Sequence, residues 1–213
     1  MCGAQAHPQP LGVIWHMARQ DAPAAGAVAV PARFGQVGPE AEAELARAMG
    51  QNASSAVRRR FEAGRRSYAA WADGHLASYG WVSFGEEHVG ELGLHLRLLP
   101  HEAYIWDCLT LAAYRRRGLY TALLGYIVQA LLGDGVQGIW IGADTDNQPS
   151  QAGIAHTGFT AVADLVAAPP QPGERRRRAW LQARPGAGQT LLSEARRAYL
   201  NEHDEVWLFA NEA

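Results

Sequence analysis

Residues 110–124 read TLAAYRRRGLYTALL, and they join the end of an apolar segment to the start of a long amphipathic one. The turn between them contains three arginines and Gly118, and apolar residues recur at helical spacing after it. The first N–H groups of a helix have no partner within the helix, and the helix dipole adds positive charge there. The stretch therefore predicts a strand, a tight turn and a helix whose start binds an anionic group.

Strand-like and helical segments continue on both sides of this turn. Helices are expected over 38–49, 52–64 and 118–132, with a short one ending at His156. Strands are expected over 68–72, 76–84, 89–99, 103–111, 138–143, 159–168 and 175–183. Asp73-Gly74 lies between the first two strands and is a strong hairpin signal. This order predicts an α/β fold, with helices and strands mixed around one sheet.

We divide the chain into three parts. Residues 1–26 are interpreted as an N-terminal extension, in which 11–17 could form a short strand. Residues 27–185 form the domain. Residues 186–213 are interpreted as a C-terminal extension with a helix over 190–200 and a short apolar end over 206–210.

The composition excludes several kinds of chemistry. All 19 basic residues are arginine, so Schiff-base catalysis and the lysine-dependent P-loop and protein-kinase mechanisms are excluded. The formal net charge of -2 argues against nucleic acid as a partner. No apolar run approaches the ~18 residues of a membrane span, and no signal peptide is visible. With two cysteines and no disulfide pattern, a cytoplasmic location is expected.

Two motifs in this order resemble the GNAT acetyltransferase superfamily. Its pyrophosphate loop reads Arg/Gln-x-x-Gly-x-Gly/Ala after the fourth strand, and Arg115, Gly118 and Tyr120 occupy the three marked positions. A later strand of alternating apolar residues, then an asparagine, a small residue and a Gly-Phe pair form the second motif. Here these are Ile139, Ile141, Ala143, Asn147, Ser150, Gly158 and Phe159.

The resemblance implies a fold and a ligand. The fold is a mostly antiparallel central sheet that splays between its fourth and fifth strands and is flanked by helices. Acetyl-CoA lies in the splay as co-substrate, with no metal. The resemblance assigns these cofactor-binding residues: Leu109, Thr110, Leu111, Arg115, Arg116, Arg117, Gly118, Leu119, Tyr120, Thr121, Asn147 and Ser150. Backbone amides of 116–121 hold the pyrophosphate, the backbone of 109–111 pairs with the pantetheine, and the Asn147 side chain contacts it.

The sequence departs from the family pattern at two positions. Tyr120 stands where the loop usually has a small residue, so either its side chain points away into the core or the pyrophosphate sits differently. Ile154 occupies the position of a tyrosine that protonates the departing thiolate in many members. His156, Tyr120 and water are the alternative proton donors.

The proton acceptor has two candidates. Asp107 lies in an otherwise apolar strand, where a carboxylate is costly unless it has hydrogen-bond partners or a catalytic role. It is therefore interpreted as a base or as a hydrogen-bonded structural residue. Glu91, on the preceding strand, is the second candidate for the base. His88, His95 and His101 form no spaced ligand set, so no metal site is expected.

Three functions are compatible with these patterns. The first is direct transfer of an acetyl group to a primary amine of a small molecule or peptide in a ternary complex, with a homodimer as one state to be tested. The second is a CoA-binding regulatory module without turnover, suggested by Ile154. The third is an interaction protein that uses the arginine clusters at 58–60, 65–66 and 175–178.

Overall fold

The protein was analysed as a computed structural model, which describes residues 9–22, 31–50, 53–89, 94–168, 178–186, 188, 198–200 and 206–209. An eight-stranded, mostly antiparallel sheet has the order β10-β9-β1-β8-β7-β4-β3-β2. Its strands are β1 (Gln9–Ala18), β2 (Arg33–Val37), β3 (Arg66–Ala72), β4 (His75–Ser83), β7 (Glu102–Thr110), β8 (Gly138–Asp144), β9 (Thr160–Ala168) and β10 (Arg178–Ala183). The mixed α/β architecture predicted from the sequence is confirmed.

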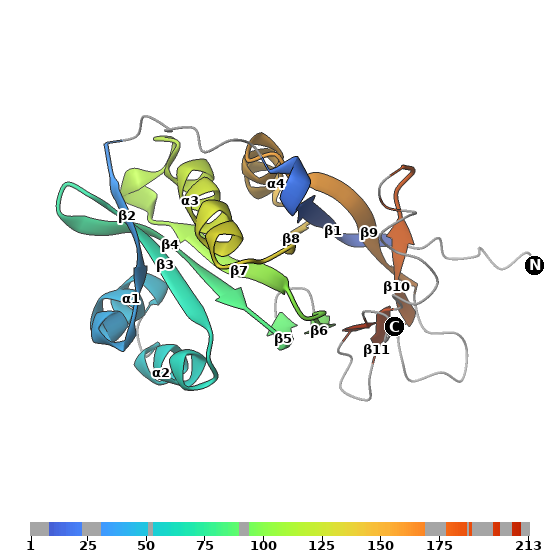
Figure 1. Ribbon diagram of the computed structural model, residues 1–213, viewed down its shortest axis with the longest axis horizontal. Helices are drawn as coiled ribbons and strands as arrows, with labels where there is room; N and C mark the ends of the chain where they lie inside the picture. Colours follow the sequence, from blue (N-terminus) through green and yellow to red (C-terminus); the bar gives the residue numbers. More distant parts are fainter. Residues whose placement is uncertain are drawn as a thin grey trace, which may run out of the picture.

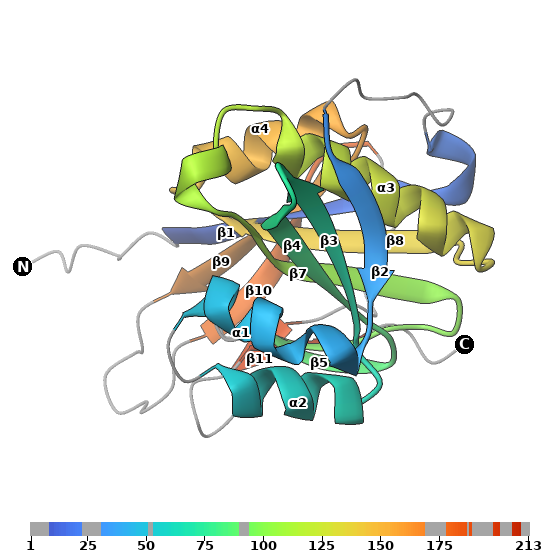
Figure 2. The same ribbon diagram turned by 90° about the vertical axis from the view of Figure 1, so that its left-hand side faces the viewer.

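Two pairs of helices cover opposite faces of this sheet (Figures 1 and 2). The helices are α1 (Glu42–Met49), α2 (Ser54–Glu62), α3 (Leu119–Gly133) and α4 (Gln148–His156). On the α3 face, Leu123 and Ile127 are buried with Ile141 of β8. On the α1 and α2 face, Val57 is buried with Trp81 of β4. No helix in the described residues is long and apolar enough to cross a membrane.

The β3–β4 hairpin forms where the sequence predicts it. Ala72 pairs with His75, which leaves Asp73 and Gly74 as a two-residue turn. Both have positive φ, 54° and 79°, as the twist of a tight hairpin requires. Turn residues with this preference encode the hairpin locally, so no distant contact was needed to predict it.

The predicted N-terminal boundary is wrong for β1. Residues 9–18 form a strand inside the sheet, paired antiparallel with β8 on one side and β9 on the other. The division at residue 26 assigned this strand to an extension outside the domain. A short apolar segment carries no local sign of its partners, which here are more than 100 residues away in the chain.

The predictions for 89–99 and for the C-terminal segment also need correction. The single strand expected over 89–99 is divided between β5 (Glu86–Val89) and β6 (Leu94–Arg97), which pair antiparallel. Residues 90–93, including Glu91, lie outside the described residues. Of the helix expected over 190–200, only Ala198–Leu200 belong to the described residues, and they form strand β11 rather than a helix. The strand β12 (Val206–Phe209) pairs with β6 and completes a second, four-stranded sheet.

Candidate functional site

The main sheet opens between β7 and β8. The two strands pair in parallel from Glu102 and Gly138 up to Ile105 and Ile141, and the pairing ends there. β7 nevertheless continues to Thr110 and β8 to Asp144. In the described part of the chain, the edge of 106–110 that faces β8 has no strand partner. The splay expected from the sequence is confirmed, and it leaves backbone hydrogen-bonding groups for a ligand.

A cavity of about 200 Å³ occupies this opening. Its lining combines β7, β8, the start of α3 and the start of α4: Tyr104, Trp106, Asp107, Cys108, Leu109, Tyr120, Ile141, Gly142, Ala143, Asp144, Asn147 and Ser150. Five of the residues predicted from the sequence are among them: Asp107, Leu109, Tyr120, Asn147 and Ser150. Tertiary structure thus brings together residues from the two motifs around one space.

A β-bulge shapes the β7 wall of this cavity. Trp106 pairs with Trp81 and Leu109 with Tyr79, so Asp107 and Cys108 together face Gly80. Asp107 has a φ of 43°, in the left-handed region that aspartate tolerates better than most residues. A Cβ on Gly80 would lie 2.7 Å from the Cys108 Sγ, so the bulge requires a glycine opposite it.

The carboxylate of Asp107 already has partners. Arg60 of α2 forms an ion pair with it, and the same guanidinium lies over the rings of Trp81 and Trp106, 5.0 and 4.4 Å from their centroids. Burial, the charge of Asp107 and a hydrogen bond to Asp107 raise the pKa of Tyr79. Asp107 therefore has the hydrogen-bonded surroundings that the structural interpretation of this residue requires.

A buried polar network fixes the side chain of Trp106. The Trp106 Nε1 donates to the Ser83 Oγ at 2.7 Å, and Ser83 donates to the carboxylate of Glu87. The Arg65 guanidinium donates to both oxygens of that carboxylate. Glu87 is only 4% exposed, so each hydrogen bond replaces water that the group has lost. Nothing in the local sequence around Glu87 indicates this network.

The start of α3 presents unpaired backbone donors beside the cavity. Gly118 precedes the helix with a φ of 75°, and no side chain caps it. The first N–H bonded within the helix is that of Ala122, which donates to the Gly118 carbonyl. The N–H groups of Leu119, Tyr120 and Thr121 lie ahead of it and have no intrahelical acceptor. The structure therefore has the anion-binding geometry that residues 110–124 predict.

The three arginines of the loop have different surroundings. The Arg115 Nε donates to the Thr110 carbonyl at 3.1 Å. Arg117 lies 3.5 Å from the Asp73 carboxylate and over the Tyr114 ring. Arg116 has a φ of 63°, and no ion pair to its guanidinium is found among the described residues. Of the three, Arg116 is therefore the one whose guanidinium is most available to a ligand.

Tyr120 points into the cavity and toward α4. Its ring lies against Gly153, where a Cβ would be 2.4 Å from the Tyr120 Cδ1. Its hydroxyl hydrogen-bonds to Ser150, whereas burial and the nearby Cys108 raise its pKa. The bulky side chain thus turns away from the loop and leaves the backbone of the helix start accessible.

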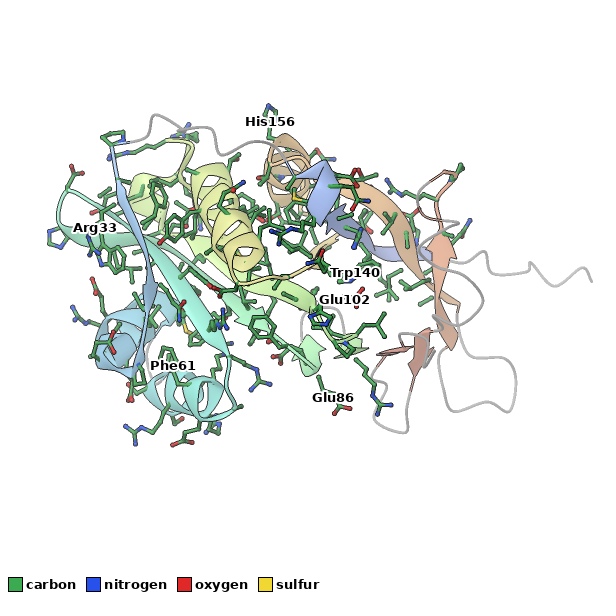
Figure 3. All side chains as sticks on the ribbon, viewed as in Figure 1. Arg33, Phe61, Glu86, Glu102, Trp140 and His156 are labelled. Atoms are coloured by element: carbon green, nitrogen blue, oxygen red, sulfur yellow. The ribbon has the colours of Figure 1, made fainter. Side chains whose placement is uncertain are left out.

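Neither the position of the missing tyrosine nor the alternative donor His156 lies on the cavity. Ile154 is fully buried in the core under α3. His156 is exposed at the end of α4 and points away from the sheet (Figure 3). Its Nδ1 lies 3.2 Å from the Ala152 carbonyl oxygen, within its own helix. Only Tyr120, of the two side chains proposed as substitutes, lines the cavity.

Asn147 joins the second motif to the cavity. It is the N-cap of α4, where its Oδ1 accepts from the Ser150 N–H at 3.2 Å. This capping bond uses the oxygen, which leaves the two amide N–H donors for a ligand.

Asp144, which sequence reasoning missed, ends β8 on the same cavity. Burial and the negative charge of Asp146 raise its pKa above the ordinary aspartate range. The only signal in the sequence is an acidic residue at the end of a buried strand. Among the described residues, no group of three or more histidine, cysteine or acidic side chains could hold a metal ion.

Comparison with known proteins agrees with this geometry. The model of the acetyltransferase (GNAT) family matches residues 39–159, more than half of the chain. No curated protein gives a significant match. Solved structures with a similar fold include a GNAT acetyltransferase of Colwellia psychrerythraea (TM-score 0.57, 14% identity, 76% of this chain and 56% of that chain).

Two further structures are similar in fold. One is a tandem GNAT protein from the clavulanic acid biosynthesis pathway (TM-score 0.51, 22% identity, 73% of this chain, 52% of that chain). The other is a GNAT-family acetyltransferase, described as putative, of Novosphingobium aromaticivorans DSM 12444 (TM-score 0.51, 17% identity, 74% and 63%). The chain spans between about half and two thirds of the length of these three structures.

Proposed function

Because the chain belongs to the GNAT acetyltransferase family, we propose that it transfers an acetyl group from acetyl-CoA to a primary amine of a small molecule or peptide. The observation that carries this proposal is the cavity between β7 and β8, which lies beside the unpaired N–H groups at the start of α3. One ligand, with its thioester in the cavity and its pyrophosphate at the helix start, would use both features of the site.

The residues around the cavity fit the parts of acetyl-CoA. The N–H groups of Leu119–Thr121 and the guanidinium of Arg116 bind the pyrophosphate, because both are donors next to the positive end of a helix dipole. The backbone of Leu109–Leu111, which includes the end of the free β7 edge, pairs with the amides of the pantetheine, and the Asn147 amide adds a donor from the α4 side. Acetyl-CoA supplies the thioester that the amine attacks.

Tyr120 is proposed as the residue that protonates the departing thiolate. Its hydroxyl lies on the cavity wall with Ser150, and burial keeps it protonated at neutral pH. A phenol that retains its proton donates a hydrogen bond to a developing thiolate and can pass a proton to it. Tyr120 would then replace, from α3, the tyrosine that the family usually places at the position of Ile154.

Replacement of Tyr120 by phenylalanine tests this role. Tyr120→Phe removes the hydroxyl and keeps the ring against Gly153, so kcat is expected to fall about 100-fold with little change in the Kd for CoA. Initial rates of thiol release measure kcat, and calorimetry measures the Kd. His156→Ala is the control and is expected to retain full activity, because that side chain lies outside the cavity. An unchanged kcat in Tyr120→Phe would assign the proton transfer to water.

Asp107 is proposed to hold the bulge of β7 in place rather than to accept the proton. Its ion pair with Arg60 and its hydrogen bond with Tyr79 engage the carboxylate. Both contacts tie the carboxylate to side chains of α2 and β4, which fixes the position of the bulge. Glu91 stays a sequence-based candidate for the base.

The function as a whole is tested by titration and turnover with the wild-type chain. Calorimetric titration is expected to show CoA and acetyl-CoA binding well below millimolar ligand, and a panel of primary amines is expected to include acceptors that release free thiol. Binding without thiol release from any amine would favour the CoA-binding module, which the buried Ile154 also suggests. No binding at millimolar ligand would refute both.

A further inference from the structure

Asp144 faces the side of the cavity opposite to α3. Along β8, Ile139, Ile141 and Ala143 belong to the core beneath α3. Successive side chains of a strand point to opposite faces, so Asp144 points with Gly142 toward the other face, where Trp106 packs. Gly142 has no side chain to fill the space beside Trp106. The Asp144 carboxylate therefore lies where a second substrate can approach from the α1 and α2 face.

The backbone of Asp144 is held on two sides. Its carbonyl accepts from the Asn147 N–H at 3.0 Å and from the Gln151 Nε2 at 2.9 Å. Its Cα pairs with Gly12 of β1 at the end of the β1–β8 ladder. These backbone hydrogen bonds restrain the position of the Asp144 side chain, as a catalytic or binding group requires.

One of the two carboxylates that line the cavity has no cationic partner among the described residues. Its lining includes the carboxylates of Asp107 and Asp144 but no arginine or histidine. Arg60 pairs with Asp107, whereas no cationic side chain in the described ranges pairs with Asp144. An acidic wall beside aromatic side chains favours a cationic ligand over an anionic or neutral one.

Resting on the proposed acetyl transfer, we propose that the acceptor is a cationic amine and that the Asp144 carboxylate binds its ammonium group and accepts the proton. The ammonium gives one proton to Asp144, which frees the nitrogen lone pair. That pair forms the N–C bond to the acetyl carbon, and the C–S bond breaks with its electrons on sulfur. The second N–H proton is lost to solvent as Tyr120 protonates the thiolate and regains a proton from water. Asp144 then returns its proton to water.

The surroundings of Asp144 are suited to this proton transfer. Burial and Asp146 raise its pKa, which brings the carboxylate closer to neutral pH as a base. The titratable groups around the cavity are Tyr104, Asp107 and Cys108 from β7 and Tyr120 from α3, with Arg60 reaching it through Asp107. From α4 and from β1, the groups that contact Asp144 are the neutral Asn147, Gln151 and Gly12, and the charged neighbour in the loop after β8 is Asp146.

The test compares Asp144→Asn with Asp146→Asn. Asparagine keeps the size of the side chain but can neither accept the proton nor attract the ammonium, so kcat/KM for a cationic amine is expected to fall about 100-fold. The Kd for CoA and the melting temperature are expected to stay unchanged. Asp146→Asn keeps the Asp144 carboxylate but removes the negative charge that raises its pKa. Its acidic limb is therefore expected to move to lower pH, while the rate above that limb stays within about threefold of wild type.

Two further readouts separate base catalysis from a structural role. The probes are 1,5-diaminopentane as cationic acceptor and glutamate as anionic acceptor; wild type is expected to prefer the first, and Asp144→Asn to lose most of that preference. The wild-type rate is also expected to fall as pH drops through the pKa of Asp144, because the protonated carboxyl cannot accept a proton. In Asp144→Asn the break at the pKa of Asp144 disappears, and the rate falls with pH only as the fraction of free amine does.

The experiments on Asp144→Asn distinguish failure of this inference from failure of the proposed acetyl transfer. If wild type acetylates amines and Asp144→Asn keeps its rate and pH profile, this inference is overturned and the acetyl transfer stands. Equal losses of CoA affinity or melting temperature in Asp144→Asn would also overturn it, in favour of a structural role. A wild-type preference for glutamate would refute the cationic acceptor. Absence of CoA binding to wild type would instead refute the proposed function.

Discussion

Gly118→Glu is expected to weaken CoA binding about 1,000-fold, equivalent to ~4 kcal/mol. Gly118 precedes α3 with a φ of 75°, next to the N–H groups proposed to hold the pyrophosphate. A glutamate there places a negative charge beside an anionic ligand and adds a side chain where the backbone must approach it. Calorimetric titration with CoA measures the loss.

The matched control is Gly118→Ala. Any residue with a Cβ is strained at this φ by about 1–2 kcal/mol, so alanine reports the strain without the charge. Both variants are expected to lose similar unfolding free energy, whereas only the glutamate loses most of its CoA affinity. If Gly118→Glu keeps its affinity for CoA, the pyrophosphate does not bind at the start of α3.

Asp107→Ala is expected to lower the free energy of unfolding by about 3 kcal/mol. The substitution leaves the partly buried guanidinium of Arg60 without its carboxylate, and it places alanine at a φ of 43°. The side chains of Arg60 and Asp107 are 19% and 22% exposed, so water screens part of the ion pair and the loss lies at the low end for buried pairs. Urea unfolding with a spectroscopic signal measures the change.

Asp107→Asn separates the two interpretations of this residue. Asparagine tolerates left-handed φ and keeps one acceptor oxygen, so its loss of stability is expected to be about 1 kcal/mol. If Asp107 were the base, Asp107→Asn would lose turnover about 100-fold at nearly full stability, as we expect for Asp144→Asn. A double-mutant cycle with Arg60→Met measures the coupling energy between the two side chains. A value near zero would show that the ion pair does not hold the bulge.

Local patterns carried the predictions that the structure confirms. The start of α3 could be placed because the turn, Gly118 and the apolar spacing lie within one continuous stretch, 110–124. The β3–β4 hairpin followed from Asp73-Gly74 for the same reason. The short helix expected to reach His156 is α4, and the structure adds that Asn147, expected in the loop before it, caps this helix on the cavity that Tyr120 also lines.

The failures share a physical cause. The place of β1 depends on hydrogen bonds to β8 and β9, whose residues are more than 100 positions away. The bulge at Asp107 arises because β7 fits β4 with one extra residue, and only the paired strand shows which residue that is. Residues 198–200, expected to be helical, form β11 instead, because they pair with β12, which is itself hydrogen-bonded to β6.

The lysine-free sequence by itself determined the family and the turn before α3, and it predicts an anion site there, because backbone donors and glycine conformations are encoded within a few residues. Tertiary structure alone decided where each side chain points. It engages Asp107 with Arg60, turns Tyr120 onto Gly153 and leaves Asp144 without a cationic partner among the described residues. Whether a carboxylate or phenol holds, donates or accepts a proton depends on its neighbours in space, and those neighbours come from elements far apart in the chain.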